Sequence, residues 1–235
     1  MTDNSLNAWL LHKQPLGDTS LKAIFYTREQ GIIPCVYKGG RLPKKQTLLQ
    51  PFIPLWLSVR HQKNSQWCYV SQIENTGPSL ILNGDSLFAG LYINELIYYL
   101  LADSEPSTLF YDSYELTLKA LAQTQARLEL EAILRYFEYR LLQLCGYAFS
   151  YTHEAYSYQL IDLKKHYTFI AGHGFVPAHQ GLLGSDILAL GQGQLNTPHL
   201  LKLAKHIMRQ AINHALDGRA LISRNLFKMR TSFKH

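Results

Sequence analysis

The sequence predicts an α+β protein in which a small five-stranded β-barrel precedes a helical domain. Two observations lead to this prediction. Short apolar runs separated by turn residues fill residues 7–75, whereas beyond about residue 78 the apolar residues recur with the 3.6-residue period of a helix. The chain has 235 residues, 47% of them hydrophobic and 17% charged, a composition typical of globular rather than disordered proteins.

The barrel is predicted from five apolar segments with turn residues between them. The segments are residues 8–11, 21–26, 32–37, 55–59 and 67–70. The turns contain Gly17-Asp18, Gln30-Gly31 and Gly39-Gly40, residue types that supply the backbone angles of tight turns. Five strands at this spacing fit a Greek-key barrel of the oligonucleotide-binding type, the OB-fold, over residues 1–80.

The helical domain is predicted over residues 81–235. Its helices are expected at about residues 85–101, 107–122, 124–144, 198–216 and 223–229. The third of them has its apolar side chains on one face, and Gly146 is expected to cap its C-terminus. Asn196-Thr197-Pro198 predicts the start of the fourth, because a capping side chain precedes a first-turn proline.

The formal net charge of +6 is unevenly distributed along the chain. Residues 1–85 contain nine Lys and Arg against five Asp and Glu, residues 86–150 contain four against eight, and residues 151–235 contain ten against four. A polyanion responds to the local potential rather than to the total charge, so two basic regions favour a nucleic acid as the partner. The acidic middle region can equally be an ordinary solvated helix face.

The loop after the third predicted strand is the first candidate DNA-binding site. Glycine at Gly39-Gly40 allows the backbone to approach a partner closely or to adopt a positive φ angle. Lys and Arg side chains suit phosphate oxygens, Arg as a planar fork and Lys as a point charge. The candidate DNA contacts here are Lys38, Arg41, Lys44 and Lys45. The alternative is a solvated hairpin turn.

The C-terminal region contains the second candidate DNA-binding site. Lys202, Lys205 and Arg209 recur at steps of three and four residues, which places them on one helix face. Arg224 follows in the same basic region. A solvated amphipathic helix is the alternative, but two separate cationic elements in one protein favour shared binding of a phosphate backbone.

Motifs of catalysis and of cofactor binding are absent. The sequence contains no P-loop, no nucleophile elbow and no His-Glu-x-x-His helix, so we expect no catalytic residues, no cofactor and no enzymatic activity. Its three Cys residues have neither disulfide-framework nor zinc spacing, and no signal peptide or membrane-spanning segment is visible, so we expect a cytoplasmic protein that does not bind membranes.

A histidine cluster gives a weaker indication of a metal site. Four histidines lie within 27 residues: His153, His166, His173 and His179. Metal ligands must converge on one point, and this spacing does not force them to. A His-rich loop region is therefore favoured, and we expect no bound metal.

Seven motifs are spread along the sequence: Ala8-Trp9-Leu10-Leu11-His12, Asp18-Thr19-Ser20-Leu21, Tyr37-Lys38-Gly39-Gly40-Arg41, Leu49-Gln50-Pro51-Phe52, Gly90-Leu91-Tyr92-Ile93-Asn94-Glu95-Leu96, Leu134-Arg135-Tyr136-Phe137-Glu138 with Leu141-Leu142, and Gly146-Tyr147. In their order and spacing they resemble the RecO family of DNA repair proteins, and the resemblance covers nearly the whole sequence except roughly residues 150–195. Near the C-terminus, Leu221-Ile222-Ser223-Arg224-Asn225-Leu226-Phe227 resembles the closing motif of the family.

The resemblance implies an OB-fold barrel, a helical bundle and a small inserted module at residues 150–195. It implies a recombination mediator of the RecF pathway that binds single- and double-stranded DNA and anneals complementary strands. The implied partners are RecR, the C-terminal tail of the single-stranded-DNA-binding protein SSB and, indirectly, RecA, at the nucleoid and without a nucleotide cofactor. Many members have a four-cysteine zinc module after the Gly-Tyr motif; here no Cys follows Cys145, so a metal-free, degenerate zinc-finger-like region is expected.

The resemblance also singles out Arg135 as a contact for the acidic, Phe-ended SSB tail. The alternative for Arg135 is an intrahelical ion pair with Glu131 or Glu138.

For the whole protein, the main alternative is an interaction scaffold whose basic surface recruits acidic partner proteins without DNA contact. A metal-dependent nuclease is disfavoured because no carboxylate or Cys/His ligand pattern is present.

Overall fold

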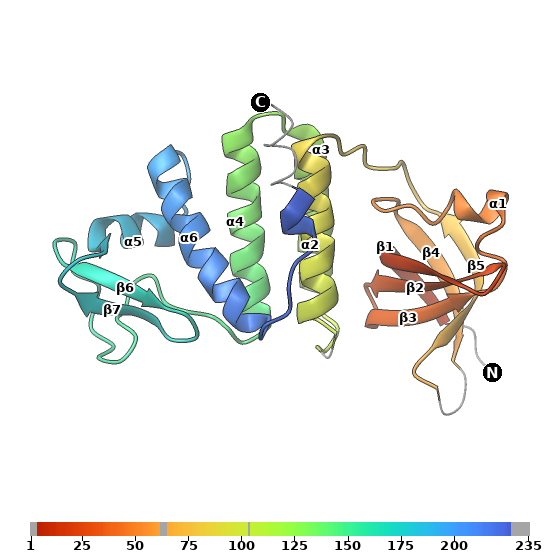
Figure 1. The fold of residues 1–235 in the computed structure, drawn as a ribbon, viewed down its shortest axis with the longest axis horizontal. Coiled ribbons are helices and arrows are strands. Elements are labelled where there is room, and N and C mark those ends of the chain that lie inside the picture. Colours follow the sequence, from red (N-terminus) through yellow and green to blue (C-terminus); the bar gives the residue numbers. More distant parts are fainter. Residues whose placement is uncertain (1–3, 62–64, 103, 227–235) are drawn as a thin grey trace. The chain divides into compact units, whose positions relative to one another are not determined.

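The computed structural model describes residues 4–61, 65–102 and 104–226, which form two compact units (Figure 1). Unit 1 contains residues 1–123 and 221–235, and unit 2 contains residues 124–220. The boundary that the sequence suggested at residue 80 separates the barrel from the first long helix, both of which lie in unit 1.

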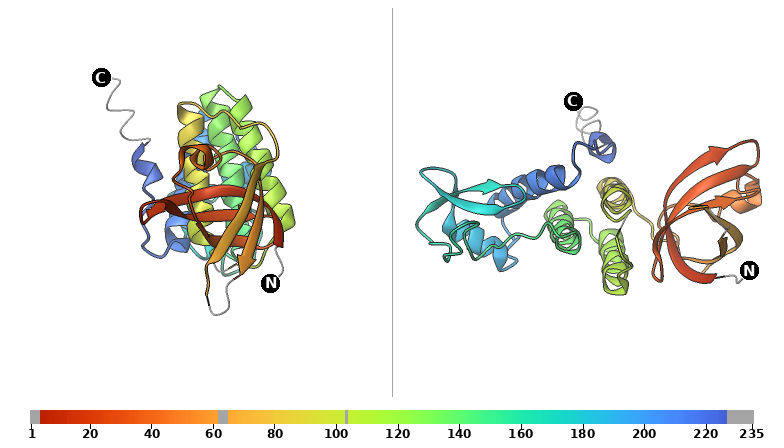
Figure 2. Two further views of the ribbon diagram at one scale, coloured as in Figure 1. Left: turned by 90° about the vertical axis from the view of Figure 1, so that its right-hand side faces the viewer. Right: turned by 90° about the horizontal axis from the view of Figure 1, so that it is seen from below.

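The prediction of an N-terminal five-stranded barrel is confirmed. Its strands are β1 (Asn4–Leu16), β2 (Ser20–Thr27), β3 (Gly31–Tyr37), β4 (Leu55–His61) and β5 (Cys68–Asn75). They close in the order β1-β2-β3-β5-β4. Figure 2 shows the barrel from two further sides. Every neighbouring pair is antiparallel except β3 and β5, which are parallel and paired through Cys35↔Cys68 and Val36↔Tyr69.

Alternation along the strands determines which side chains fill the barrel. Along β3 every second residue is buried, with Ile33, Cys35 and Tyr37 inside. The same period puts Ala23 and Phe25 of β2 inside, and leaves Lys22 on the outer surface. The apolar alternation that predicted the strands therefore also predicts the barrel core.

A short helix, α1 (Pro43–Gln46), connects β3 to β4 and was not predicted. Four residues make little more than one turn, too few for a helical period to be visible in the sequence. Pro43 occupies the first turn, where its missing N–H costs no hydrogen bond. Helix α1 contains Lys44 and Lys45 of the first candidate site.

Two long helices complete unit 1: α2 (Asp85–Leu100) and α3 (Thr108–Gln123). Helix α2 packs against β1, and a buried polar chain links the elements: Tyr114 of α3 donates to the Asn94 side chain at 2.7 Å, and Asn94 donates to the Leu10 carbonyl at 3.4 Å. Ser107 accepts from the Phe110 amide at the start of α3, and Gly84 is the N-cap of α2.

The segment after residue 220 returns to unit 1. The Glu95 carboxylate accepts hydrogen bonds from the Ile222 and Ser223 amides, at 2.8 and 2.9 Å, and from the Ser223 hydroxyl. Residues 223–226 are helical, and the remainder of the short helix predicted there lies outside the described residues.

Unit 2 consists of two long helices and a small β-containing module (Figure 1). Its elements are α4 (Arg127–Leu144), β6 (His166–Ile170), β7 (Gly174–Ala178), β8 (Leu182–Leu183), α5 (Gly184–Gly191) and α6 (Pro198–Ala215). Helix α4 packs against α6, and the module has a three-stranded sheet in the order β7-β6-β8.

The ends of the unit 2 helices follow the sequence prediction. Thr197 accepts from the Leu200 amide at 3.2 Å and caps α6, with Pro198 in the first turn. Gly146 has φ 79° just after α4, where a residue with a Cβ would be strained. The sheet and α5 were not predicted, because strands of two to five residues show no clear period.

Among the residues that the structure describes, no helix is both long and apolar enough to cross a membrane.

Candidate nucleic-acid interface

The loop after β3 has a defined shape because backbone hydrogen bonds tie it to the turn between β1 and β2. Arg41 donates from its backbone N–H to the Thr19 carbonyl at 2.9 Å, and from its guanidinium Nη1 to the Gly17 carbonyl at 2.6 Å. Gly40 packs so closely on Tyr37 that a Cβ there would lie 2.9 Å from the ring. The glycines of this loop thus serve its fold, and Arg41 serves as a brace as well as a surface cation.

Three lysines of the barrel lie over aromatic rings. The Lys38 Nζ is 5.3 Å from the centroid of the Tyr69 ring, and the Lys45 Nζ is 4.9 Å from that of Tyr37. The third pair places the Lys22 Nζ 5.0 Å from the centroid of the Trp67 ring. Each ring attracts the cation through its negative face, so these contacts fix where positive charge lies on the barrel.

Lys22, Trp67 and Tyr69 were not among the predicted site residues, although alternation along the strands contained a signal for them. Lys22 lies between two inward residues of β2, and Trp67 and Tyr69 flank the buried Cys68. Their side chains therefore point outward. We call the outer surface formed by Lys22, Lys38, Arg41, Lys44, Lys45, Trp67 and Tyr69 the barrel face.

Strand register continues the barrel face into a row across four strands. Lys22 of β2 pairs with Val36 of β3, Val36 pairs with Tyr69 of β5, and Tyr69 pairs with Arg60 of β4. Side chains of one row lie side by side on the same surface of a sheet. The row thus places two cations, Lys22 and Arg60, on either side of an apolar and aromatic centre.

The second candidate site lies on α6 in unit 2. Lys202, Lys205 and Arg209 are all exposed, whereas Leu201, Ala204 and other residues of the opposite face are buried. The Lys205 Nζ lies 3.5 Å from the Glu131 carboxylate of α4. A pair this exposed contributes about 0–1 kcal/mol, so a phosphate can compete for Lys205.

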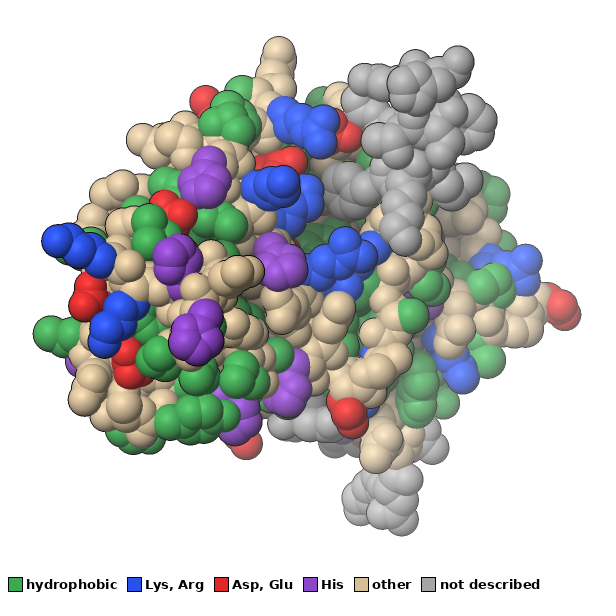
Figure 3. Space-filling view, turned by 60° about the vertical axis from the view of Figure 1, so that its left-hand side comes forward, with side chains coloured by type: hydrophobic (Ala, Val, Ile, Leu, Met, Phe, Trp, Pro, Cys, Tyr) green, Lys and Arg blue, Asp and Glu red, His purple; other side chains and the backbone are tan. Residues whose placement is uncertain are grey.

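The predicted DNA contacts are thus divided between the two units. Lys38, Arg41, Lys44 and Lys45 are in unit 1, together with the partly exposed Arg224, and the three cations of α6 are in unit 2. Figure 3 shows one face of the molecule, where Lys and Arg, histidine and acidic side chains are interspersed among apolar ones.

Arg135 has a buried acidic partner. Its guanidinium donates to the Glu138 carboxylate at 2.7 Å, and the two side chains are only 9% and 1% exposed. Both groups act on Tyr151: burial raises the pKa of the Tyr151 phenol, the charge of Glu138 raises it further, and that of Arg135 lowers it. The geometry corresponds to the ion-pair alternative, with Glu138 rather than Glu131 as partner. A contact with the SSB tail stays a prediction.

The His-rich region is organised around aromatic rings. Among the described residues, no three His, Cys, Asp or Glu side chains gather closely enough to hold a metal ion. The rings of Phe149, Phe169 and Phe175 pack with centroids 4.8 to 5.9 Å apart. Tyr151 adds a fourth ring to this cluster. The expectation that the region binds no metal stays a prediction.

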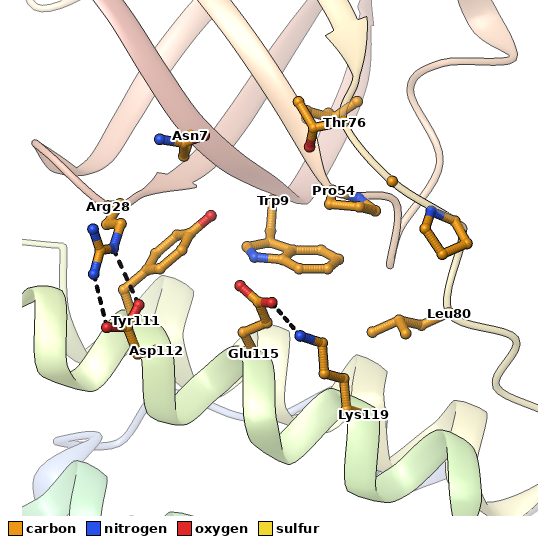
Figure 4. Close-up of a pocket in the computed structure, with 13 residues that line it drawn as sticks. Asn7, Trp9, Arg28, Pro54, Thr76, Leu80, Tyr111, Asp112, Glu115 and Lys119 are labelled. Atoms are coloured by element: carbon orange, nitrogen blue, oxygen red, sulfur yellow. Dashed lines mark hydrogen bonds and ion pairs between the residues drawn. The ribbon is translucent and has the colours of Figure 1, made fainter.

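A cavity of about 340 Å³ lies between the barrel and α3 in unit 1 (Figure 4). Arg28 closes one end by a two-fold hydrogen bond to Asp112, at 2.8 and 3.1 Å, and Lys119 is paired with Glu115 at 2.5 Å on the same helix. In the close-up Trp9 lies above the Glu115–Lys119 pair. Since each cation here already has a carboxylate partner, this cavity does not fit a phosphate as the barrel face does.

A closed OB-like barrel with cations and aromatic rings on its outer surface, followed by helices, is an architecture that many nucleic-acid-binding proteins share. The chain belongs to the RecO family of DNA repair and recombination proteins. Residues 1–78 match the family model described as "Recombination protein O N terminal", and residues 82–224 match "Recombination protein O C terminal".

Curated relatives agree with this assignment over nearly the whole chain. A protein named DNA repair protein RecO from Legionella pneumophila (strain Paris) is 48% identical over 228 residues, covering 97% of this chain and 99% of the relative. The protein of the same name from Pseudomonas putida (strain W619) is 37% identical over 227 residues, covering 95% and 96%.

Proposed function

We propose that this protein is a recombination mediator that binds single- and double-stranded DNA through the phosphate backbone and anneals complementary strands. The observation that supports this most directly is the barrel face, where three lysines lie over aromatic rings beside a braced basic loop. Membership of the RecO family supports the same function.

Annealing by this protein requires no covalent chemistry, so we propose that it is not an enzyme. Neutralising phosphates lowers the repulsion between two strands, and holding them on one molecule raises their effective concentration. Backbone contacts contain no base information, so annealing is expected to be independent of sequence.

We also propose that RecR and the SSB tail are its partners, and that together with RecR it helps to load RecA on SSB-coated strands at the nucleoid. Membership of the RecO family supports these partners. For the tail, a contact at Arg135 would have to compete with Glu138, because the two side chains are paired and buried.

The salt dependence of oligonucleotide binding tests the proposal. Replacing Lys38, Arg41, Lys44 and Lys45 together by Ala should reduce the slope of log K against log salt by roughly 2 to 3, since each single-strand phosphate contact contributes about 0.7. Because Arg41 also braces the loop, a variant that retains Arg41 and replaces only the three lysines should reduce the slope by about 2.

The matched control is Lys164→Ala with Lys165→Ala, which removes two exposed lysines of unit 2 outside both candidate sites. It should leave the slope unchanged. An interaction scaffold without DNA contact would instead bind no oligonucleotide at low salt, and this result would overturn the proposed function.

A further inference from the structure

We propose that Trp67 and Tyr69 form a base-stacking platform, so that the barrel face binds a single-stranded segment by its bases as well as by its phosphates. This inference rests on the proposed function and specifies the ligand of the same site. Duplex DNA cannot make this interaction, because its bases are stacked on one another and offer no free face.

The two rings are placed for this by alternating burial at the start of β5, where Trp67 immediately precedes the first strand residue, Cys68. Cys68 between them is buried, at 3% exposure, so Trp67 and Tyr69 share the outer side of the barrel, where both remain partly exposed. Residues two apart on a strand are about 6.7 Å apart, roughly twice the 3.4 Å step between stacked bases of one strand. Neighbouring bases must therefore separate from each other to stack on both rings, which only an unpaired strand can do at low cost.

Each ring has its own cation. Lys22 lies over Trp67 and Lys38 over Tyr69, with Nζ-to-centroid distances of 5.0 and 5.3 Å. A cation–π contact at a partly exposed site is weak, so a base can take the ring face while the flexible lysine turns to the adjoining phosphate. The pairs thus provide both parts that binding of single strands requires, a stacking surface and a neighbouring positive charge.

The cationic side of α6 has positive charge but no aromatic stacking surface. Its residues Lys202, Lys205 and Arg209 are exposed, but α6 contains no Phe, Trp or Tyr. It can hold phosphates of either DNA form. We therefore assign base contact to the barrel face alone among the two candidate sites.

An abasic oligonucleotide separates stacking from charge, because it keeps the phosphates and lacks the bases. The probes are a labelled oligothymidine of about 12 nucleotides, within the usual site size of one OB-fold, and an abasic oligomer of equal length. The parent protein should bind oligothymidine roughly tenfold more tightly than the abasic oligomer. Trp67→Ala with Tyr69→Ala should remove this difference and leave the affinity for the abasic oligomer unchanged.

The matched variant Trp67→Phe with Tyr69→Phe retains two rings and should keep the preference for oligothymidine. It should also lose the share of the tryptophan fluorescence quenching by oligothymidine that comes from Trp67, whereas the buried Trp9 and the partly exposed Trp56 are retained. These readouts stand even if the Ala variant fails to fold.

Equal affinity of the parent protein for the two probes would overturn the stacking platform. If both probes then still bind with a steep salt dependence, the proposed function stands without it. Binding of neither probe would overturn both proposals. An Ala variant that folds and keeps the parent's preference would remove Trp67 and Tyr69 from the site.

Discussion

At the residue scale, burial decides what a charged side chain of a family motif does. Arg135 and Glu138 lie three residues apart on α4, so one helix face brings them together. Their 9% and 1% exposure means that removing one charge leaves the other in a low-dielectric interior. The sequence offered this pair as an alternative but could not show that the pair is buried.

Arg135→Ala should reduce the free energy of unfolding by roughly 3–5 kcal/mol, because the buried Glu138 carboxylate loses the guanidinium with which it forms an ion pair. Denaturant unfolding of parent and variant measures the difference. The double variant Arg135→Met with Glu138→Leu removes both charges and should recover most of the loss. A loss below about 1 kcal/mol for the single variant would show that Glu138 reaches solvent.

The same double variant tests the SSB-tail contact without unfolding the protein. If Arg135 binds the tail, an acidic, Phe-ended peptide should bind the double variant more weakly by at least about 1.5 kcal/mol, the lower end for a charge-assisted contact. Fluorescence anisotropy of a labelled peptide measures this. Equal affinity would remove Arg135 from the site.

A second residue pair, Arg28 and Asp112, makes the stability of the fold depend on pH. The hydrogen bond from Arg28 lowers the pKa of the Asp112 carboxyl. A carboxyl with a lowered folded-state pKa stabilises the fold above its ordinary value of about 3.9, and the contribution is lost as pH falls through the folded-state pKa. Asp112→Asn should therefore lower Tm at pH 7 and leave it unchanged once the pH is below the folded-state pKa.

This effect should be small, because the Arg28 and Asp112 side chains are 44% and 47% exposed. Calorimetry at the two pH values, with Arg28→Gln as the partner variant, measures it. A Tm difference that persists at acid pH would show that Asp112 acts through packing and not through its charge.

At the element scale, the long periodic segments were predictable and the short ones were not. The five barrel strands and α2, α3, α4 and α6 follow from alternation, helical spacing and caps such as Thr197. Helix α1 and strands β6 to β8 have only two to five residues each, so their periods do not emerge from the sequence. The barrel closes through the pairing of β3 with β5, two segments that are far apart in the sequence, so a local pattern could not predict it.

The candidate site was likewise predictable from the sequence only in part. The basic loop and the α6 cations are local patterns, visible as runs and repeats in the sequence. The Lys22–Trp67 and Lys38–Tyr69 contacts exist only because β2, β3 and β5 are neighbours in the closed barrel. No spacing rule within one strand links Lys22 to Trp67, so the aromatic half of the site required the three-dimensional fold.

The small module of unit 2 should depend on its aromatic cluster and not on zinc. Phe175 is fully buried against Phe149 and Phe169, and Phe175→Ala should cost about 3–5 kcal/mol of stability through the cavity it leaves. A strong chelator should leave Tm unchanged. Elemental analysis that finds about one zinc per chain would contradict this and would make His153, His166, His173 and His179 the first ligands to replace.

At the scale of the whole molecule, the positive charge is divided between an OB-like barrel in unit 1 and α6 in unit 2. If both elements bind DNA as proposed, one chain can engage two strands or two stretches of one strand. The proposed annealing would use the first possibility, because each strand then meets its complement at a high effective concentration. Binding to a short oligonucleotide needs only one element, so the two activities should respond differently to the same variants.

We therefore compare annealing by the parent with a loop variant (Lys38, Lys44 and Lys45 replaced by Ala) and an α6 variant (Lys202, Lys205 and Arg209 replaced by Ala). Complementary donor- and acceptor-labelled oligonucleotides in low-salt buffer with chelator report the rate, and the absence of free magnesium excludes nuclease action. Each variant should slow annealing, and their combination should slow it by roughly tenfold or more, since up to six phosphate contacts are lost. The Lys164→Ala, Lys165→Ala control should anneal at the parental rate. If the α6 variant anneals as the parent does while the loop variant does not, the barrel alone holds the DNA and the α6 cations are a solvated helix face.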